Sequence, residues 1–271
     1  MNARLSLVPA TPVRTAEPDP GRNPLVRKLR SLVNLNAADV AALEEISLPP
    51  RLLGPRVDLI RSEEGSGDAV MLLEGFACRY KQRQAGQRQI MAYLLPGDLC
   101  DVDASYLGRM DHAVGTLASS VVVRIPRQAL ADLVSRHPNI AQALRMARLF
   151  EEATTREWVV NLGCRSAMER MAHLFCELLT RFQMVGMAEG DSCPLPLTQA
   201  DLGDTLGLSN VHVNRTLQEL RRQGLVELRG KSLRLLKVRR LQEIGEFNPA
   251  YLQPVDGAKG HAAVGLVSGL A

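Results

Sequence analysis

Residues 197–226, LTQADLGDTLGLSNVHVNRTLQELRRQGLV, have the pattern of two short helices joined by a tight turn. Thr198 is placed to cap the first helix, with Asp201 three residues on, where a hydroxyl and a carboxylate satisfy each other's free backbone N–H groups. Gly207 ends that helix where the turn needs a residue without a Cβ, and Ser209 can cap the second helix. The stretch therefore predicts a helix-turn-helix.

The second helix, expected over residues 210–223, has one apolar and one mostly polar face. Helical spacing places Val213, Leu217 and Leu220 on the buried stripe. The opposite side suits base edges in a major groove. Its expected base contacts are Asn210, Val211, Asn214, Arg215 and Gln218. The expected phosphate contacts, which orient without specifying, are Thr198, Gln199, Ser209, His212 and Lys231.

An ordinary helical hairpin with a solvated polar face is the alternative, and the sequence that follows argues against it. Gly224 ends the second helix, and LVELRGKSLRLLKV predicts two short strands around a turn at Gly230 and Lys231, which would form a wing. Between His212 and Arg240 there are nine Lys or Arg and two acids. Such an imbalance is typical of a surface that binds phosphates.

The segment GLSNVHVNRTLQELRRQGLVELRGKSLRL resembles the C-terminal winged helix of the Crp/Fnr superfamily of bacterial transcription regulators. The resemblance continues through LLEGFACRYKQ and LLPGDLCD and covers about residues 25–245. It implies an α+β chain with an N-terminal double-stranded β-roll, cyclic-nucleotide-binding-like, then a long dimerisation helix and a C-terminal winged helix-turn-helix. It also implies a homodimer on a two-fold-related operator in double-stranded DNA, with RNA polymerase as a further partner.

The family's recognition helix carries an Arg, a Glu and a second Arg as base readers. The matching positions here are Asn210, Val211 and Arg215, so only the last is kept. We expect Arg215 to make the main base contact, bidentate to guanine O6 and N7. Val211 cannot accept a hydrogen bond from cytosine N4 and would sooner touch a thymine methyl, so the half-site should differ at that base pair.

Composition limits the class of protein. A chain of 271 residues, 46% hydrophobic and 23% charged, is long enough for two domains and a connecting element. No apolar run approaches the ~18 residues of a membrane span, and the N-terminus lacks a charged region before an apolar core, so we expect a cytoplasmic protein. The five cysteines show no CxxC spacing and none lies in residues 1–77, which argues against a zinc site and the family's N-terminal iron–sulfur cluster.

From about residue 51 to residue 125, short strand patterns alternate with turn residues, which predicts the roll. Within it, LLEGFACRY resembles the family's central hairpin. Two helices should precede the roll, over residues 23–33 and 36–46, the second capped by Asn36. Residues 1–23 hold four prolines without periodicity and are expected to be a disordered leader.

The family's ligand-binding cassette begins at Pro96-Gly97-Asp98, and here it departs from the pattern of cyclic-nucleotide binders. The Arg that would hold the cyclic phosphate is replaced by Met110, Asp111 or His112, so a cyclic nucleotide is not expected. A metal on the nearby carboxylates and His112 is disfavoured, because His112 is the only histidine in the roll. The expected pocket for an unidentified effector comprises Gly97, Asp98, Leu99, Cys100, Asp101, Met110, Asp111 and His112.

After a short helix over residues 126–137, about 24 residues run without a breaker. Their apolar surface, which includes Leu144, Phe150 and Trp158, is too broad for one neighbour, so we expect a dimerisation helix that ends at a hinge at Gly163. The expected parts are residues 1–23 (leader), 24–137 (roll and flanking helices), 138–163 (dimerisation helix), 164–248 (winged helix) and 249–271 (flexible tail).

Catalytic motifs are absent from the sequence: there is no nucleophile elbow, glycine-rich phosphate loop or HExxH, so no enzyme activity and no cofactor are expected. Three hypotheses remain open. The chain is a regulator gated by a small molecule, a regulator with a vestigial pocket, or a roll-type ligand- or metal-binding protein or enzyme with an incidental helical C-terminal domain.

Overall fold

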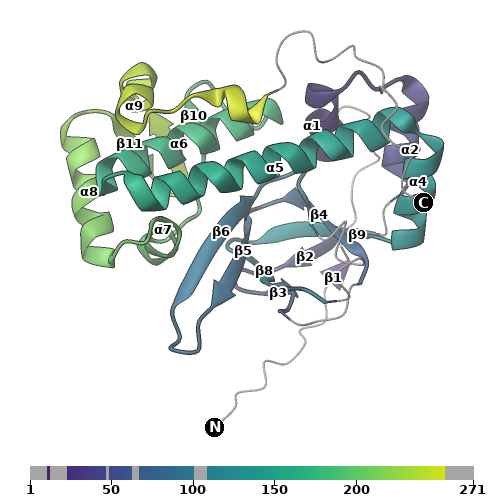
Figure 1. Ribbon diagram of the computed structural model, residues 1–271, viewed down its shortest axis with the longest axis horizontal. Coiled ribbons are helices and arrows are strands. Elements are labelled where there is room, and N and C mark those ends of the chain that lie inside the picture. The colour runs from purple at the N-terminus through teal and green to yellow at the C-terminus, as the bar shows by residue number, and fades with distance from the viewer. Residues whose placement is uncertain (1–10, 13–22, 47–48, 63–66, 101–108, 254–271) are drawn as a thin grey trace, which may run out of the picture.

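The computed structural model describes residues 11–12, 23–46, 49–62, 67–100 and 109–253. Two antiparallel sheets form the predicted roll (Figure 1). One has the order β1-β2-β9-β4-β7, with β1 Thr11–Pro12, β2 Arg51–Leu53, β4 Ala69–Glu74, β7 Leu99–Cys100 and β9 Ser120–Ile125. The other has the order β3-β8-β5-β6, with β3 Asp58–Ile60, β5 Ala77–Gln82, β6 Arg88–Leu94 and β8 Ala113–Thr116. Apolar residues that include Leu72, Leu94 and Val114 fill the space between the sheets.

The prediction of a hairpin in LLEGFACRY is wrong. Strand β4 pairs with β7 and β9, whereas β5 pairs with β6 and β8, so the chain crosses between the sheets at Gly75. Gly75 has φ 99°, and a Cβ there would lie 2.3 Å from the Ser120 Oγ. Only glycine fits this crossing without strain.

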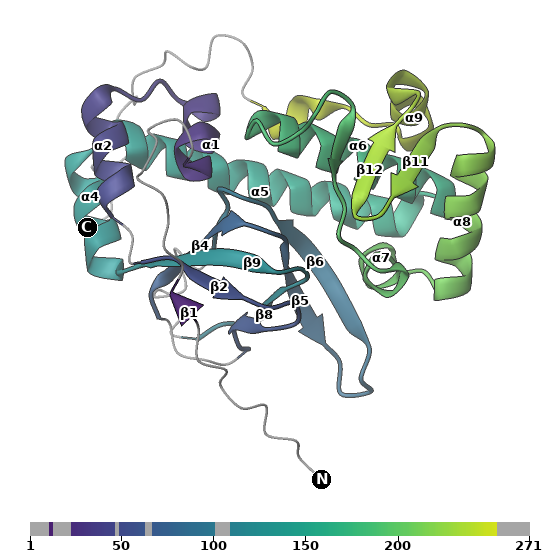
Figure 2. The same ribbon diagram turned by 180° about the vertical axis from the view of Figure 1, so that it is seen from behind.

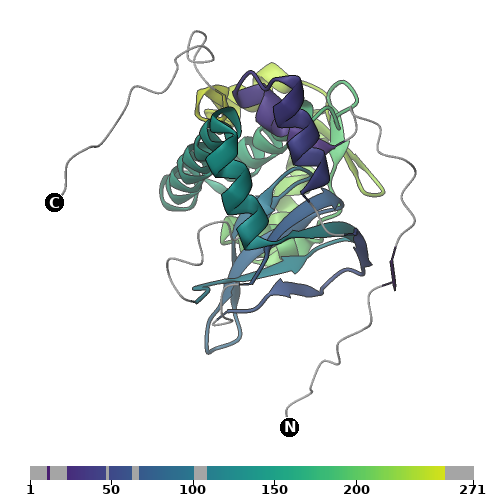
Figure 3. The same ribbon diagram turned by 90° about the vertical axis from the view of Figure 1, so that its right-hand side faces the viewer.

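Helices cover one side of the roll, and Figure 3 shows them above the strands. The first two are α1 Pro24–Leu32 and α2 Ala37–Glu45, as predicted, and Asn36 and Asp39 form a capping box at the start of α2. α4 Arg127–Arg136 leads out of the roll. The predicted leader includes strand β1, which pairs with β2, and its other residues lie outside the described ranges except Asn23, which caps α1.

The long helix α5, Pro138–Cys164, runs for 27 residues, which is about 40 Å, across the whole molecule (Figure 1). The predicted hinge at Gly163 is wrong, because Gly163 lies inside the helix. A glycine costs only about 1 kcal/mol in a helix, and nothing forces a break there. The chain turns instead at Arg165, which has extended backbone, before Ser166 caps the next helix.

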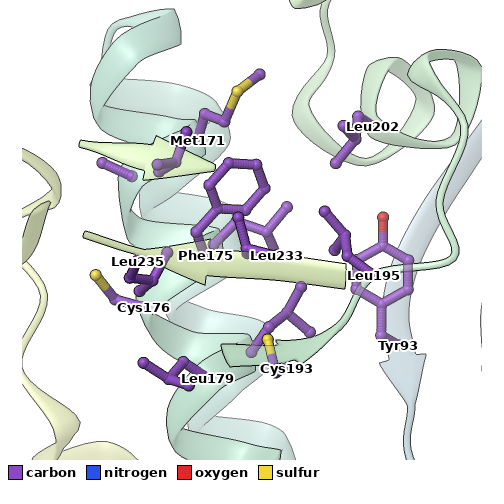
Figure 4. Packing of buried hydrophobic residues seen from close by; sticks show 14 of the residues in the cluster. Tyr93, Met171, Phe175, Cys176, Leu179, Cys193, Leu195, Leu202, Leu233 and Leu235 are labelled. Carbon is purple, nitrogen blue, oxygen red and sulfur yellow. The ribbon is translucent and has the colours of Figure 1, made fainter. Parts of the chain in front are cut away.

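The C-terminal domain comprises α6 Ala167–Met184, β10 Ser192–Pro194, α7 Gln199–Leu206, α8 Asn210–Arg222, β11 Val226–Arg229, β12 Ser232–Leu235, α9 Val238–Gly245 and the 3₁₀ helix η1 Pro249–Leu252. The two predicted wing strands are present, and the preceding polar loop adds a third strand, β10, beside β12. Figure 4 shows Phe175 and Leu179 of α6 close to Leu233 and Leu235 of the wing.

The roll and the C-terminal domain share one continuous apolar core. Tyr93 of β6 reaches Leu195 of the C-terminal domain (Figure 4), and its ring lies 5.5 Å from Trp158 of α5. Phe76 lies 6.1 Å from Phe182 of α6. This shared core fixes the orientation of the C-terminal domain on the roll, and Figure 2 shows α7 beside the strands β5 and β6.

Candidate DNA-binding surface

The helix-turn-helix forms at the predicted residues, with the predicted caps. The Thr198 hydroxyl accepts from the Asp201 N–H at 3.1 Å, and the Asp201 carboxylate accepts from the Thr198 N–H at 3.0 Å. Gly207 caps α7 in the left-handed region, with φ 64°, and Ser209 caps α8. The ends of both helices of the motif are therefore determined by residues close to them in the sequence.

The outer face of α8 is open to solvent. Val211 is 78% exposed, and Asn210, Arg215 and Gln218 are exposed too. Asn214 is partly exposed, and its amide donates to Gln199 Oε1 at 3.4 Å. The structure therefore brings all five predicted base-reading residues together on one helix face. The opposite stripe, Val213, Leu217 and Leu220, is buried as expected.

The five predicted phosphate contacts are all exposed. Thr198 and Gln199 stand at the N-terminus of α7, and Ser209 and His212 stand at the N-terminus of α8, with 2.9 Å between the Ser209 Oγ and the His212 Nδ1. Lys231 lies in the turn between the wing strands. The free N–H groups of two helix ends and a lysine suit anionic oxygen atoms.

The inner side of α7 is bound to the roll, which the sequence did not predict. Asp201 is fully buried, and the guanidinium of Arg56 donates two hydrogen bonds, of 2.7 and 2.8 Å, to its carboxylate. Arg88 of β6 donates to the same carboxylate at 2.6 Å and to Asp204 at 2.8 Å. Burial acts to raise the pKa of Asp201, but the bonds from Arg56, Thr198 and Arg88 outweigh it and lower that pKa to about 2.

A second contact lies beside the first. The hydroxyls of Tyr93 and Thr205 are hydrogen-bonded, and Thr205 also donates to the Asp201 carbonyl at 2.8 Å. The Gln89 amide donates to the Thr205 carbonyl at 3.3 Å. We call this set, Arg56, Arg88, Gln89 and Tyr93 on the roll with Asp201, Asp204 and Thr205 on α7, the roll–α7 contact.

The residues predicted as an effector pocket do not come together. Cys100 and Met110 are buried in the core between the two sheets. Asp111 is exposed, where it contacts His112 at 2.7 Å and Lys81 at 2.9 Å, and those contacts lower its pKa to about 2. Gly97, Asp98 and Leu99 line a cavity on the other side of the sheet, towards α1 and α5, while Asp101 lies outside the described residues.

In the described part of the chain, His, Cys, Asp and Glu side chains do not gather in a group of three or more that could hold a metal ion. None of the helices in that part is long and apolar enough to cross a bilayer. The five cysteines are free thiols, and Cys164 is the exposed one.

Comparison with known proteins agrees with this geometry. A family model described as the Crp-like helix-turn-helix domain matches residues 169–244. The nitrogen fixation regulation protein FixK of Bradyrhizobium diazoefficiens is 28% identical over 173 residues, which are 64% of this chain and 72% of that protein. The fumarate and nitrate reduction regulatory protein of Vibrio cholerae is 25% identical over 210 residues, which are 78% of this chain and 84% of that protein.

The fold is also that of solved structures. FixK2 from Bradyrhizobium japonicum superposes with a TM-score of 0.65 and 24% identity over 73% of this chain and 97% of that one. The regulator CLP from Xanthomonas campestris gives a TM-score of 0.59 and 17% identity over 74% of this chain and 100% of that one. Residues 169–244 belong to the Crp-like helix-turn-helix family, and the whole chain, with its β-roll, its long connecting helix and its winged helix-turn-helix, is similar to the bacterial transcription regulators of the Crp/Fnr superfamily.

Proposed function

We propose that this regulator binds a two-fold-related operator as a homodimer, with α8 of each subunit in a major groove. The observation that carries the proposal is the outer face of α8. That face holds four exposed side chains and the partly exposed Asn214, while the remaining sides of the helix-turn-helix are packed on α6, the wing or the roll. Helices that enter a major groove present such a face.

The dimer contact is proposed from the exposed side of α5. Leu149 is 54% exposed, Val159 66% and Val160 43%. The residues that the sequence suggested, such as Leu144, Phe150 and Trp158, pack mainly within the chain itself. Leu149, Ala153, Arg156 and Val160 follow the alternating spacing of four and three residues of a helix pair. A second copy of α5 would cover this side and place two recognition helices about 34 Å apart.

Sequence selection is proposed to rest on Arg215, with Asn210, Asn214 and Gln218 as secondary readers. A guanidinium that bonds guanine O6 and N7 together discriminates by about 1–3 kcal/mol. Val211, the most exposed apolar residue of the helix, would contact a thymine methyl. Thr198, Gln199, Ser209, His212 and Lys231 would bind phosphates and set the register.

The proposal includes no catalysis and no cofactor. Met110, one candidate for the position of the cyclic-phosphate arginine, is buried in the roll core, and the adjacent Asp111 is acidic. A cytoplasmic location and a contact with RNA polymerase belong to the proposal as properties expected of a bacterial transcription regulator.

Selection of random duplexes on the purified protein tests the proposal. We expect an enriched site with two inverted half-sites, each with a guanine at one fixed position. Recovery of duplexes without a shared motif at low salt would contradict a sequence-specific role. Failure to retain any duplex would contradict DNA binding itself.

The dimer contact has its own test. Leu149→Glu would place two carboxylates against each other across the two-fold axis, so we expect monomers in sedimentation equilibrium. Loss of the second half-site should lower the affinity for a complete operator roughly 10²- to 10⁴-fold. Arg136→Glu, on the exposed side of α4, is the matched control and should remain dimeric. A dimeric Leu149→Glu protein would contradict the assignment of α5.

A further inference from the structure

A cavity of about 370 Å³ lies where four parts of the molecule meet. Its walls come from α1, from the turn that follows β6, from the middle of α5 and from the end of α6. Two of these walls belong to the roll side and one belongs to the DNA-binding domain. A cavity of this size accommodates a small organic molecule, and anything bound in it would contact both domains.

Aliphatic side chains form most of the wall. The wall includes Leu25 and Leu29 of α1, Leu144 and Phe150 of α5, and Met184 of α6. These side chains cannot hydrogen-bond, so a polar body such as a nucleotide or a sugar would lose its water without compensation. The body of a fitting ligand is therefore hydrocarbon.

The charged residues on the wall are mainly cationic. Five bases, Lys28, Arg79, Arg145, Arg148 and Arg181, stand against two acids, Asp98 and Glu151. Arg79 pairs with Glu151, and Asp98 is shared by Lys28 and Arg181. Within the described residues, Arg145 has no carboxylate within salt-bridge distance, and it lines the cavity while remaining exposed to solvent. Arg148 lies 3.6 Å from Glu152 of the same helix, so the positive charge that favours an anionic headgroup is chiefly that of Arg145.

The wall charges extend into a buried network that joins the domains. Asp98 accepts from Arg181 of α6 at 2.9 Å, and Arg181 also donates to the Tyr93 carbonyl at 2.8 Å. Arg181 lies 3.3 Å from the fully buried Glu177, which accepts from the indole of Trp158 at 3.0 Å. An anion that competes with Asp98 for its cations would therefore disturb the attachment of α6 to the roll.

We infer that this cavity binds a monocarboxylate with an aliphatic chain, such as a medium-chain fatty acid, and that occupancy alters how the DNA-binding domain is held. The chain would lie among the leucines, and the carboxylate would lie at Arg145 and Lys28. The binding part of the inference stands on the cavity alone. Only the expected effect of the bound ligand on DNA binding rests on the proposed function.

Trp158, the one tryptophan of the chain, reports on the site through the Arg181–Glu177 network. Octanoate titrated into the full-length protein without DNA should give a saturable change in tryptophan fluorescence and a matching calorimetric isotherm. Octanol and octylamine lack the carboxylate, and acetate lacks the chain, so each should bind at least about ten-fold more weakly. Equal binding of octanol and octanoate would overturn the assigned headgroup, and no saturable binding of octanoate would overturn the site.

Two variants locate the site. Ala147→Phe should fill the cavity and abolish octanoate binding, while Arg145→Ala, a surface change compatible with folding, should weaken it about ten-fold. Arg136→Ala on α4 is the matched control and should bind octanoate as the native chain does. Unchanged octanoate affinity in Arg145→Ala would contradict the proposed carboxylate position. Duplex binding measured separately distinguishes the two proposals, because failure of the fatty-acid site leaves operator selection intact.

Discussion

Helices α7 and α8 are consecutive parts of one motif, separated by three residues, and they have opposite surroundings. The outer face of α8 is largely open to solvent, with Val211 78% exposed. The first turn of α7 holds Asp201, which has no exposed surface and lies under two arginines of the roll. One helix thus has an open face, while its neighbour is bound to the roll.

The difference shows where the two domains are joined. None of the described ion pairs or hydrogen bonds joins the outer face of α8 to the roll. The roll–α7 contact attaches α7 to the roll, and the turn at Gly207 connects α7 to α8. Variants on the two helices should therefore separate effects on stability from effects on DNA binding.

Asp201→Ala should have the largest effect on stability. It removes the carboxylate half of the capping box of α7 and leaves Arg56 and Arg88 without their shared carboxylate. Breaking a buried pair in this way costs about 3 kcal/mol, moderated here because the Arg56 side chain is 45% exposed. The free energy of unfolding from urea titration should fall by about that amount.

Asp204→Asn is the matched control for this change. Among the described residues Asp204 bonds Arg88 alone, and its side chain is 31% exposed, so its loss should cost less than about 1 kcal/mol. If Asp201→Ala were no more damaging than Asp204→Asn, the roll–α7 contact would not hold the domain.

Arg215→Ala should act on DNA binding alone. The side chain is exposed, so stability should stay within about 0.5 kcal/mol of the native value. Selectivity for the operator over random duplex, measured by fluorescence anisotropy, should fall by about 1–3 kcal/mol. Arg222→Ala, on the same helix but paired with Glu219, should keep that selectivity. An equal loss of specific and nonspecific binding would refute the role given to Arg215.

Local sequence predicted α8 well, because its determinants lie within a few residues of one another. Ser209 caps the helix, Val213, Leu217 and Leu220 form the buried stripe, and the exposed face follows from the same period. The capping box at Thr198 and Asp201 was predictable for the same reason. The exposed face of α8 could therefore be predicted without knowledge of contacts between distant parts of the chain.

Long-range features were not predictable. Arg56 and Arg88 are 145 and 113 residues from Asp201, and a capping role already accounts for that aspartate, so nothing in the sequence indicated a second set of partners. Gly163 failed as a hinge because an isolated glycine in a helix is tolerated when its neighbours favour the helix. The cavity likewise depends on four elements whose mutual placement no local pattern reports.

The effect of acid on stability should come in part from the roll–α7 contact. The folded pKa of Asp201, about 2, lies below the ordinary value of 3.8, so its contribution is fully present above about pH 4 and is lost as the pH falls towards 2. The expected size is about 2 kcal/mol. Asp98 and Asp39 also have lowered pKa values, so unfolding should be compared between the native chain and Asp201→Asn. Parallel pH profiles of the two proteins would contradict the assignment.

The smallest effect is expected at Lys231, in the wing turn. If this lysine binds a phosphate, Lys231→Ala should weaken binding to all duplexes alike and reduce the slope of log affinity against log salt concentration by about 1, since each neutralised phosphate releases close to one counterion. Operator selectivity should not change, because a phosphate contact carries no sequence information. Lys81→Ala, on the roll and paired with Asp111, should leave the slope unaltered. A changed slope in Lys81→Ala would show that the roll contacts DNA together with the helix-turn-helix and the wing. The contrast between an open α8 and a covered α7 would then no longer describe how this protein binds its operator.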